Sequence, residues 1–463
     1  MTVDVLPDDV LVEIFCYVNR RDNLNTQNPW HALVHVCRRW RYLVFASPCR
    51  LNLQLDYRGH GPIPEVLDAW PVLPLIIRGG PRENPRLDPR WDNRVAAFES
   101  EHHNRICEIR LSFLPISRWN RFTAAMRKPF PELTYLYLSV CNWGSVSVLP
   151  ESFLGGSAPR LRELSLTSIS FPSIPKLLLS VHSLVDLSLW DIPDSGYFSP
   201  DAMATTLKVM TRLESLHLQF RSPRSRPDPA SRPLLPPTRS VLPALTKLIF
   251  GGVYEYLEDL LTRIDAPLLC YLYVDFFMDL NFDLPQLHRL IGHAEEFKAY
   301  NHAKVVIFDF AIDLSLYHKT GPLDCSRRLE LRIQCGELDW QLSSLAQFCS
   351  PSFPLISTLE ELEIRVFKLS SSHWKDDMGH TRWLELLDSF TALKNLYLTC
   401  GVAQRVCGTL QEVSGERATE VLPALRNLFV DGFRSLEHIQ EAIGPFVAAR
   451  QLSGHPVAID HWR

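Results

Sequence analysis

Leu133-Thr134-Tyr135-Leu136-Tyr137-Leu138-Ser139-Val140-Cys141 is the stretch of sequence that decides the fold. Its apolar residues stand at offsets 0, 3, 5 and 8 from Leu133. Because side chains alternate across a strand, offsets 3 and 5 place two leucines on one face and Tyr137 on the other. The stretch therefore predicts a short strand with one face against a core and the other toward water.

The same frame returns eight more times along the chain. The later matches begin at Leu161, Leu184, Leu213, Leu245, Leu269, Leu359, Leu393 and Leu425. Counted from Leu133, successive starts are 28, 23, 29, 32, 24, 90, 34 and 32 residues apart. One such unit cannot bury its own apolar side, so neighbouring units must stack. We expect an α/β fold in which an irregular leucine-rich-repeat solenoid carries a curved parallel sheet with outer helices and loops, in about a dozen units.

Weaker strands fill the gaps between the repeats, at residues 51–55, 73–77, 106–111, 304–308 and 329–333. A doubly wound α/β enzyme is the alternative fold, because its strands also alternate with helices. Such strands are buried on both faces and read as continuous apolar runs. Here Arg162, Glu163 and Ser165 interrupt the leucines of one strand. This alternation favours the solenoid.

Composition limits the class of protein. A chain of 463 residues is long enough for two to four domains, and 22% charged with 46% hydrophobic residues is typical of a folded protein. A formal net charge of -4 predicts no general attraction to nucleic acid or anionic lipid. No uninterrupted apolar run reaches about 18 residues, so we expect no membrane span. The 11 scattered cysteines indicate reduced thiols, and hence a cytoplasmic or nuclear location.

Residues 1–50 do not carry the repeat. Apolar residues at positions 10, 11, 14, 15 and 18 follow Pro7 with helical spacing. A second helical stretch runs from Trp30 to Ala46 and stops at Ser47-Pro48. We expect three short helices here. Fifty residues bury little area alone, so such a bundle needs the solenoid or a partner.

These residues resemble the F-box. The family pattern is matched by Leu6-Pro7, Val10-Leu11-x-Glu13-Ile14-Phe15, Val36-Cys37-Arg38-Arg39-Trp40 and Ser47-Pro48. The sequence departs from the pattern in a longer loop after the first helix and in Arg50-Leu51, where Leu-Trp often follows Ser-Pro. An F-box followed by leucine-rich repeats is similar to the large set of fungal F-box proteins.

The resemblance implies a substrate-recognition subunit of a SKP-cullin-F-box ubiquitin ligase, without catalysis or a cofactor of its own. Residues 1–50 would dock on a SKP-type adaptor and through it on a cullin, and residues 51–463 would bind an unidentified protein substrate. The alternative is a protein-binding scaffold whose N-terminal helices only cap the solenoid. Carried over by motif position, the adaptor-contact candidates are Leu6, Pro7, Leu11, Ile14, Leu33, Val36, Cys37 and Trp40.

The outward column of the repeat strands predicts the substrate face. Aromatic residues recur in it where solvent is expected, which is typical of protein interfaces. It holds no run of Lys and Arg, so we expect no nucleic-acid partner. The substrate-binding candidates are Tyr137, His217, Tyr273, Glu363, Tyr397 and Phe429 from this column, and Trp190 from the flanking column.

The remaining features predict loops and no chemistry. Residues 221–239 hold six prolines and five arginines, and residues 78–90 are also rich in chain breakers, so both are expected to be loops. Phosphate-loop, dinucleotide, zinc-protease and serine-hydrolase motifs are absent from the sequence. We interpret two clusters as solvated charges rather than metal sites: Glu99, Glu101, His102 and His103, and His373, Asp376, Asp377 and His380. Three cysteines on or beside strands are interpreted as small core residues: Cys141, Cys270 and Cys335.

Overall fold

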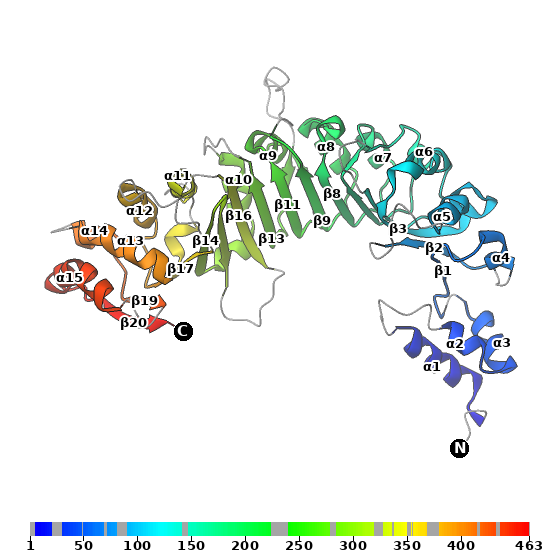
Figure 1. Ribbon diagram of the computed structural model, residues 1–463, viewed down its shortest axis with the longest axis horizontal. Helices are drawn as coiled ribbons and strands as arrows, with labels where there is room; N and C mark the ends of the chain where they lie inside the picture. Colours follow the sequence, from blue (N-terminus) through cyan, green and yellow to red (C-terminus); the bar gives the residue numbers. More distant parts are fainter. Residues whose placement is uncertain are drawn as a thin grey trace. The chain divides into compact units, whose positions relative to one another are not determined.

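The structure is a computed structural model (Figure 1), and its contacts group the chain into two compact units, Met1–Tyr197 and Phe198–Arg463. The predicted division at residue 50 is a different boundary and stays a prediction. The structure describes residues 5–20, 30–48, 50–68, 72–80, 90–140, 147–223, 239–277, 284–318, 327–335, 338–349, 353, 355–367, 379–413, 417–431 and 436–462.

Three short helices open the first unit, as the sequence predicts. They are α1 (Asp8–Arg20), α2 (Trp30–Val34) and α3 (Arg38–Ala46), drawn in blue in Figure 1. The Pro7 carbonyl oxygen accepts a 3.1 Å hydrogen bond from the Leu11 amide, which starts α1. Cys37 caps α3, since its Sγ accepts a 3.4 Å hydrogen bond from the Trp40 amide.

Beyond these helices, the first unit contains a parallel sheet in the order β1-β2-β3-β4-β6-β8. Its strands are β1 (Leu55–Tyr57), β2 (Leu75–Gly79), β3 (Ile106–Leu114), β4 (Tyr135–Val140), β6 (Glu163–Thr167) and β8 (Asp186–Ile192). A separate strand pair is β5 (Ser147–Val148) with β7 (Ile169–Ser170). Helices connect the strands: α4 (Ile63–Asp68), α5 (Arg90–Glu99), η2 (Glu101–Arg105), α6 (Ile116–Ala125), η3 (Phe153–Gly156), α7 (Ile174–Leu178) and η4 (Asp194–Gly196).

The second unit contains strands in the order β9-β11-β13-β16-β15-β14-β17-β18-β19-β20. They are β9 (Ser215–Phe220), β11 (Lys247–Gly252), β13 (Tyr271–Phe276), β14 (His302–Phe308), β15 (Ala311–Tyr317), β16 (Arg328–Gln334), β17 (Glu361–Val366), β18 (Asn395–Leu398), β19 (Asn427–Asp431) and β20 (Ala458–Trp462). A separate pair is β10 (Ser240–Val241) with β12 (Ile264–Asp265).

Helices of successive repeats pack on one another in the second unit: α8 on α9, α9 on α10, α11 on α12, α12 on α13 and α13 on α15. Helices α9, α11 and α13 also contact the strands. Their bounds are α8 (Pro200–Leu207), α9 (Tyr254–Leu261), α10 (Pro285–His293), η6 (Glu295–Ala299), α11 (Leu338–Phe348), η7 (Ile356–Thr358), α12 (Gly379–Asp388), α13 (Cys400–Gln411), α14 (Arg417–Glu420) and α15 (Leu436–Leu452). Among the described residues, no helix has the length and apolar character needed to cross a membrane.

Each of the nine repeat frames forms a strand, and their leucines lie side by side. Leu136 pairs with Leu164, and Leu164 pairs with Leu187, in the first unit. Leu362 and Leu396 are neighbours in the second unit. All five leucines are at most 1% exposed. The predicted apolar core and the leucine-rich-repeat-like α/β fold are therefore confirmed.

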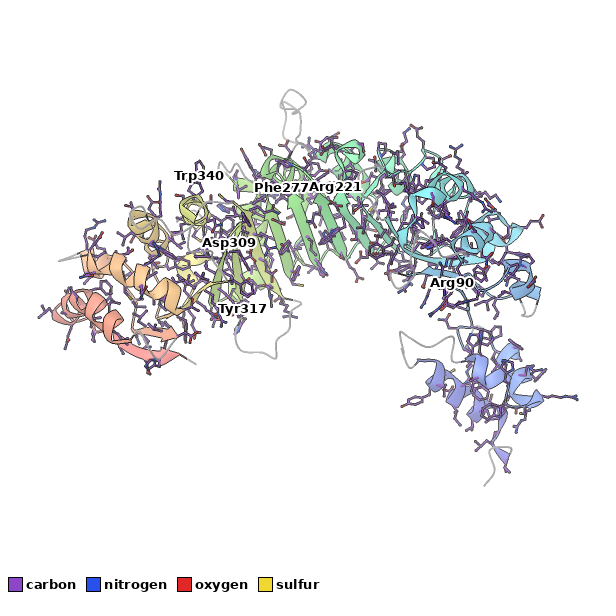
Figure 2. All side chains as sticks on the ribbon, in the orientation of Figure 1. Arg90, Arg221, Phe277, Asp309, Tyr317 and Trp340 are labelled. Carbon is purple, nitrogen blue, oxygen red and sulfur yellow. The ribbon has the colours of Figure 1, made fainter. Side chains whose placement is uncertain are left out.

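The 90-residue gap in the repeat contains strands β14 and β16 where weaker strands are expected, at residues 304–308 and 329–333, and one antiparallel strand, β15, between them. Strand β15 pairs antiparallel with both β14 and β16, whereas β14 and β16 pair parallel with β17 and β13. Tyr317 therefore lies at the opposite edge of this sheet from Phe277 (Figure 2). One strand, β15, departs from the expected parallel sheet, because the tight turn at Asp309 and Phe310 returns the chain directly.

Several sequence predictions fall outside the described residues. They concern Cys141, residues 81–89 and 224–238, and the His373, Asp376 and Asp377 cluster. At the end of the predicted 221–239 loop, Arg239 donates hydrogen bonds to the Thr262 carbonyl oxygen at 3.2 Å and to Gln286 Oε1 at 2.9 Å.

Candidate functional site

The N-terminal helices bury one apolar stripe of α1 and expose another. Leu11 and Phe15 are fully buried and belong to a cluster that includes Val34 and Val44. One residue before each, Val10 and Ile14 are both 42% exposed. With a helical repeat of 3.6 residues, adjacent positions lie about 100° apart, so only one stripe can face the core.

The eight predicted adaptor-contact residues divide by exposure. Pro7, Ile14, Val36 and Cys37 are exposed, and Leu6 and Trp40 are partly buried against the cluster. Leu11 and Leu33 lie inside the bundle, so in this structure they support the surface rather than form it. Further exposed apolar residues were missed by the motif comparison: Val10, Tyr17 and Tyr42. Spacing could have found two of them, since Val10, Ile14 and Tyr17 follow the 4–3 spacing of one helix face.

Arg39 of α3 holds the chain that enters α1. Its Nη2 donates hydrogen bonds to the Leu6 carbonyl oxygen at 2.6 Å and to Asp8 Oδ1 at 2.5 Å. Arg50, which follows α3, forms an ion pair with Glu13 of α1. These contacts fix the Leu6-Pro7 segment relative to α1 and α3.

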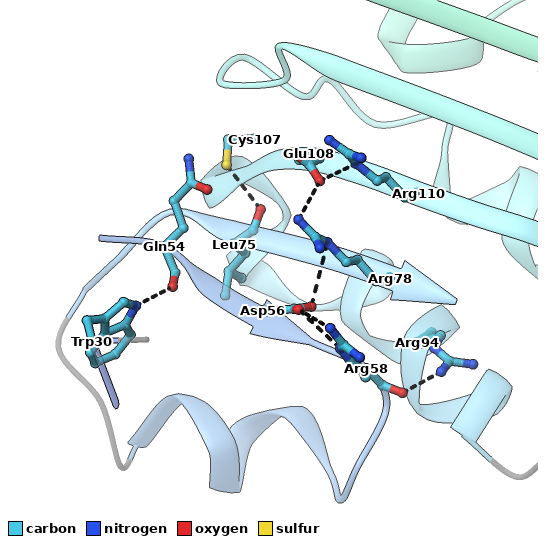
Figure 3. A network of polar contacts seen from close by, with 10 residues as sticks. All are labelled: Trp30, Gln54, Asp56, Arg58, Leu75, Arg78, Arg94, Cys107, Glu108 and Arg110. Carbon is cyan, nitrogen blue, oxygen red and sulfur yellow. Dashed lines mark hydrogen bonds and ion pairs between the residues drawn. The ribbon is translucent and has the colours of Figure 1, made fainter. Parts of the chain in front are cut away.

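The helical bundle shares its core with the chain that leads into the first strands. Leu51, Leu53 and Leu73 are members of the same buried cluster as Leu11 and Phe15. Figure 3 shows the polar part of this junction, where the indole Nε1 of Trp30 donates to the Gln54 carbonyl oxygen at 3.1 Å. The N-terminal helices are thus joined to the strands by apolar packing and a hydrogen bond.

A ladder of charged residues follows the first strands of this unit (Figure 3). Arg78 lies between Asp56 and Glu108, with N–O distances of 3.9 and 3.2 Å. Arg58 pairs with Asp56 at 3.0 Å, and Arg110 pairs with Glu108 at 2.5 Å. The arginines and carboxylates alternate, so this surface satisfies its charges within the chain.

Two predicted substrate-binding residues lie on the first unit's sheet. Tyr137 is half-buried on β4, in register with Ser165 on β6. Trp190 is 44% exposed on β8, in register with Thr167. The two residues lie in different register rows of the sheet. The row of Tyr137 reaches β8 at Ser188, two residues before Trp190.

The other five candidates lie in one row on the second unit, but three strands interrupt it. His217, Ile249 and Tyr273 are register neighbours, as are Glu363, Tyr397 and Phe429. Between the two groups, β16, β15 and β14 contribute Glu330, Ser315 and Lys304 to the row.

His217 and Glu363 are much less exposed than an outward position suggests. Each is under a tenth exposed. Glu363 is covered by its own partners, since it pairs with Arg365 and lies 3.6 Å from Lys304 Nζ. Burial lowers the pKa of His217 to about 4. A position that alternation directs outward can therefore still be buried by its neighbours on the sheet face.

Buried groups beside Tyr273 have perturbed protonation. Burial raises the pKa of the Tyr273 hydroxyl, and the neighbouring Asp275 carboxylate raises it further. Burial likewise raises the pKa of Asp275, opposed by hydrogen bonds from Gln334 Nε2 at 2.9 and 3.0 Å. Within the described part of the chain, no group of three His, Cys, Asp or Glu residues is placed to hold a metal ion.

The last two candidates form a stacked pair. The rings of Tyr397 and Phe429 lie 4.6 Å apart between centroids, with an angle of 10° between their planes. Both are half-buried. Of the seven predicted substrate-binding residues, these are the two that the structure brings into ring contact.

Comparison with known proteins identifies the class of the N-terminal domain. Residues 3–48 match the F-box-like family, so α1–α3 form an F-box-like domain. Among solved structures, the chain is similar to the leucine-rich repeat-containing protein LegL7 from Legionella pneumophila, with 12% identity over 85% of this chain and 98% of that chain and a TM-score of 0.27. Comparison with curated proteins finds no match.

Proposed function

We propose that this chain is the substrate-recognition subunit of a SKP-cullin-F-box ubiquitin ligase. The observation that carries the proposal is the F-box-like domain at residues 3–48, whose helix α1 exposes Val10 and Ile14. Exposed apolar residues on one helix face are the usual anchors of helix-in-groove binding. A SKP-type adaptor would bind these helices and connect them to a cullin.

In this proposal the repeat strands hold a protein substrate, and the chain itself catalyses nothing. F-box and leucine-rich-repeat domains are typically interaction modules. As a subunit of such a ligase the protein would act in the cytoplasm or nucleus, and it would belong with the fungal F-box proteins that its sequence resembles.

A pulldown of a purified SKP-type adaptor by the full-length chain tests the proposal. The informative variant is Ile14→Asp/Val36→Asp, which places charges on exposed apolar positions without entering the core. Val72→Asp is the matched control, because Val72 is 84% exposed outside the three helices. Circular dichroism establishes that each variant is folded.

We expect the wild type and Val72→Asp to retain the adaptor and the double variant to lose it. A folded wild type that retains no adaptor contradicts the proposal. It would favour a binding scaffold in which the helices only cap the repeats. The buried cluster that α1–α3 share with Leu51, Leu53 and Leu73 supports that second candidate.

A further inference from the structure

A stacked aromatic pair and two exposed carboxylates lie together on the sheet of the second unit. We call the set Tyr397, Phe429, Asp431 and Asp460 the aromatic–acidic face. Phe429 is in register with Tyr397 on one side and with Asp460 of β20 on the other. Asp431 follows Phe429 by two residues on the same strand, so both side chains are on one face of the sheet.

The ring of Phe429 stacks on Tyr397 through one surface only. Its other surface is directed toward the adjacent strand β20, which carries Asp460 at the paired position. Neighbouring strands lie about 4.8 Å apart, so a group placed against this side of the ring is also within reach of the carboxylate. An aromatic surface with a carboxylate beside it attracts a cation.

The carboxylates of Asp431 and Asp460 differ from that of Glu363 on the same sheet face. Glu363 is neutralised by Lys304 and Arg365. Asp431 and Asp460 are exposed and form no ion pair with any residue that the structure describes. On the five adjacent strands β14, β17, β18, β19 and β20, this sheet face carries four carboxylates and two Lys or Arg side chains among the described residues: Glu361, Glu363, Asp431 and Asp460 with Lys304 and Arg365.

We propose that the aromatic–acidic face binds a basic segment of the partner protein, with an Arg or Lys side chain stacked on Phe429 and paired with Asp431 and Asp460. This inference rests on the proposed function, because it specifies the substrate class of the recognition subunit. Arg fits the face best, since its planar guanidinium stacks on an aromatic ring and presents a fork of donors to a carboxylate.

Selection from a random dodecapeptide library on the immobilised full-length chain tests this proposal. The same library is applied to Asp431→Asn/Asp460→Asn, which keeps side-chain size and removes both charges. Glu214→Gln/Glu420→Gln is the matched control, because it removes two exposed charges elsewhere in the second unit. Selected peptides are then synthesised, and their binding is measured by fluorescence anisotropy at low and high salt.

We expect the wild type and the control to select peptides rich in Arg and Lys. Their affinity should fall about tenfold in the Asp431→Asn/Asp460→Asn variant and weaken with salt. A separate Phe429→Leu variant should lose affinity for the same peptides. The proposal is overturned if the wild type selects no peptides, if the selected peptides are no more basic than the library, or if the neutralised variant binds them equally.

Adaptor binding by the same variants separates this inference from the proposed function. We expect Asp431→Asn/Asp460→Asn to retain the adaptor, because its substitutions lie outside α1–α3. If the wild type binds the adaptor but shows no preference for basic peptides, only the proposed substrate class is overturned. If the folded wild type does not bind the adaptor, the proposed function is overturned, whichever peptides are selected.

Discussion

The indole Nε1 of Trp30 donates a 3.1 Å hydrogen bond to the backbone carbonyl oxygen of Gln54. Trp30 belongs to α2 and is 2% exposed, and Gln54 directly precedes β1. A hydrogen bond from a buried helix residue to the chain entering the first strand orients the F-box-like domain on the first strands.

Trp30→Phe tests the hydrogen bond without removing the ring. We expect the free energy of unfolding to fall by about 1 kcal/mol, because the Gln54 carbonyl group loses its donor, and Trp30→Ala to cost about 3–5 kcal/mol. Urea unfolding followed by far-ultraviolet circular dichroism measures both. Trp340→Phe is the control, since Trp340 is 61% exposed. Equal stability of Trp30→Phe and the wild type would contradict this role.

Leu11 and Ile14 should separate folding from adaptor binding. Leu11→Ala opens a cavity in the bundle core and is expected to cost about 2–5 kcal/mol. Ile14→Ala removes an exposed group, so stability should change by at most about 0.5 kcal/mol, while adaptor affinity falls. Thermal unfolding and adaptor titration measure the two effects. If Ile14→Ala left adaptor affinity intact, the exposed stripe of α1 would not be the contact surface.

We expect the burial of His217 to make the stability of the second unit fall in acid. Its pKa is about 4 in the folded chain, because burial disfavours the charged ring and the Lys247 ammonium adds to the effect. The unfolded imidazole has a pKa of about 6.5. Between these values the unfolded state binds more protons, so the free energy of unfolding falls as pH drops through the window, by about 2–3 kcal/mol.

His217→Gln removes this titration. We expect its unfolding free energy to fall less steeply between pH 7 and 4.5 than that of the wild type, as measured by urea unfolding at each pH. Parallel curves for the two proteins would show that His217 does not cause the acid sensitivity.

Arg450 should be essential to the end of the second unit. Arg450 is 1% exposed, and its guanidinium donates to the carbonyl oxygens of Ala418 and Leu422 at 3.2 Å and of Pro423 at 3.1 Å. Arg450→Lys keeps the charge but lacks the planar fork, so about 2–3 kcal/mol should be lost.

Hydrogen exchange at residues 417–425 measures the local effect of Arg450→Lys, and thermal unfolding measures the global one. Arg426→Lys is the control, because Arg426 is exposed. Unchanged protection of residues 417–425 in Arg450→Lys would contradict this account.

The candidate site was only partly predictable. Motif matching selected Ile14 and Val36, which are exposed, but it also selected Leu11 and Leu33, which the bundle buries. Periodicity shows that α1 has two apolar stripes, and it does not say which stripe faces α2 and α3. Asp460 was missed because β20 lacks the leucine frame and is recognisable only by its pairing with β19.

Local pattern alone determined the repeat strands, the three N-terminal helices and the resemblance to the F-box. These features depend on residues close together in sequence, such as the leucines at offsets 3 and 5. Tertiary structure decided the antiparallel β15, the burial of His217 and Glu363, and the stacking of Tyr397 on Phe429. Strand alternation has the same period in parallel and antiparallel sheets, and exposure depends on neighbours distant in sequence, so neither could be inferred from the order of residues.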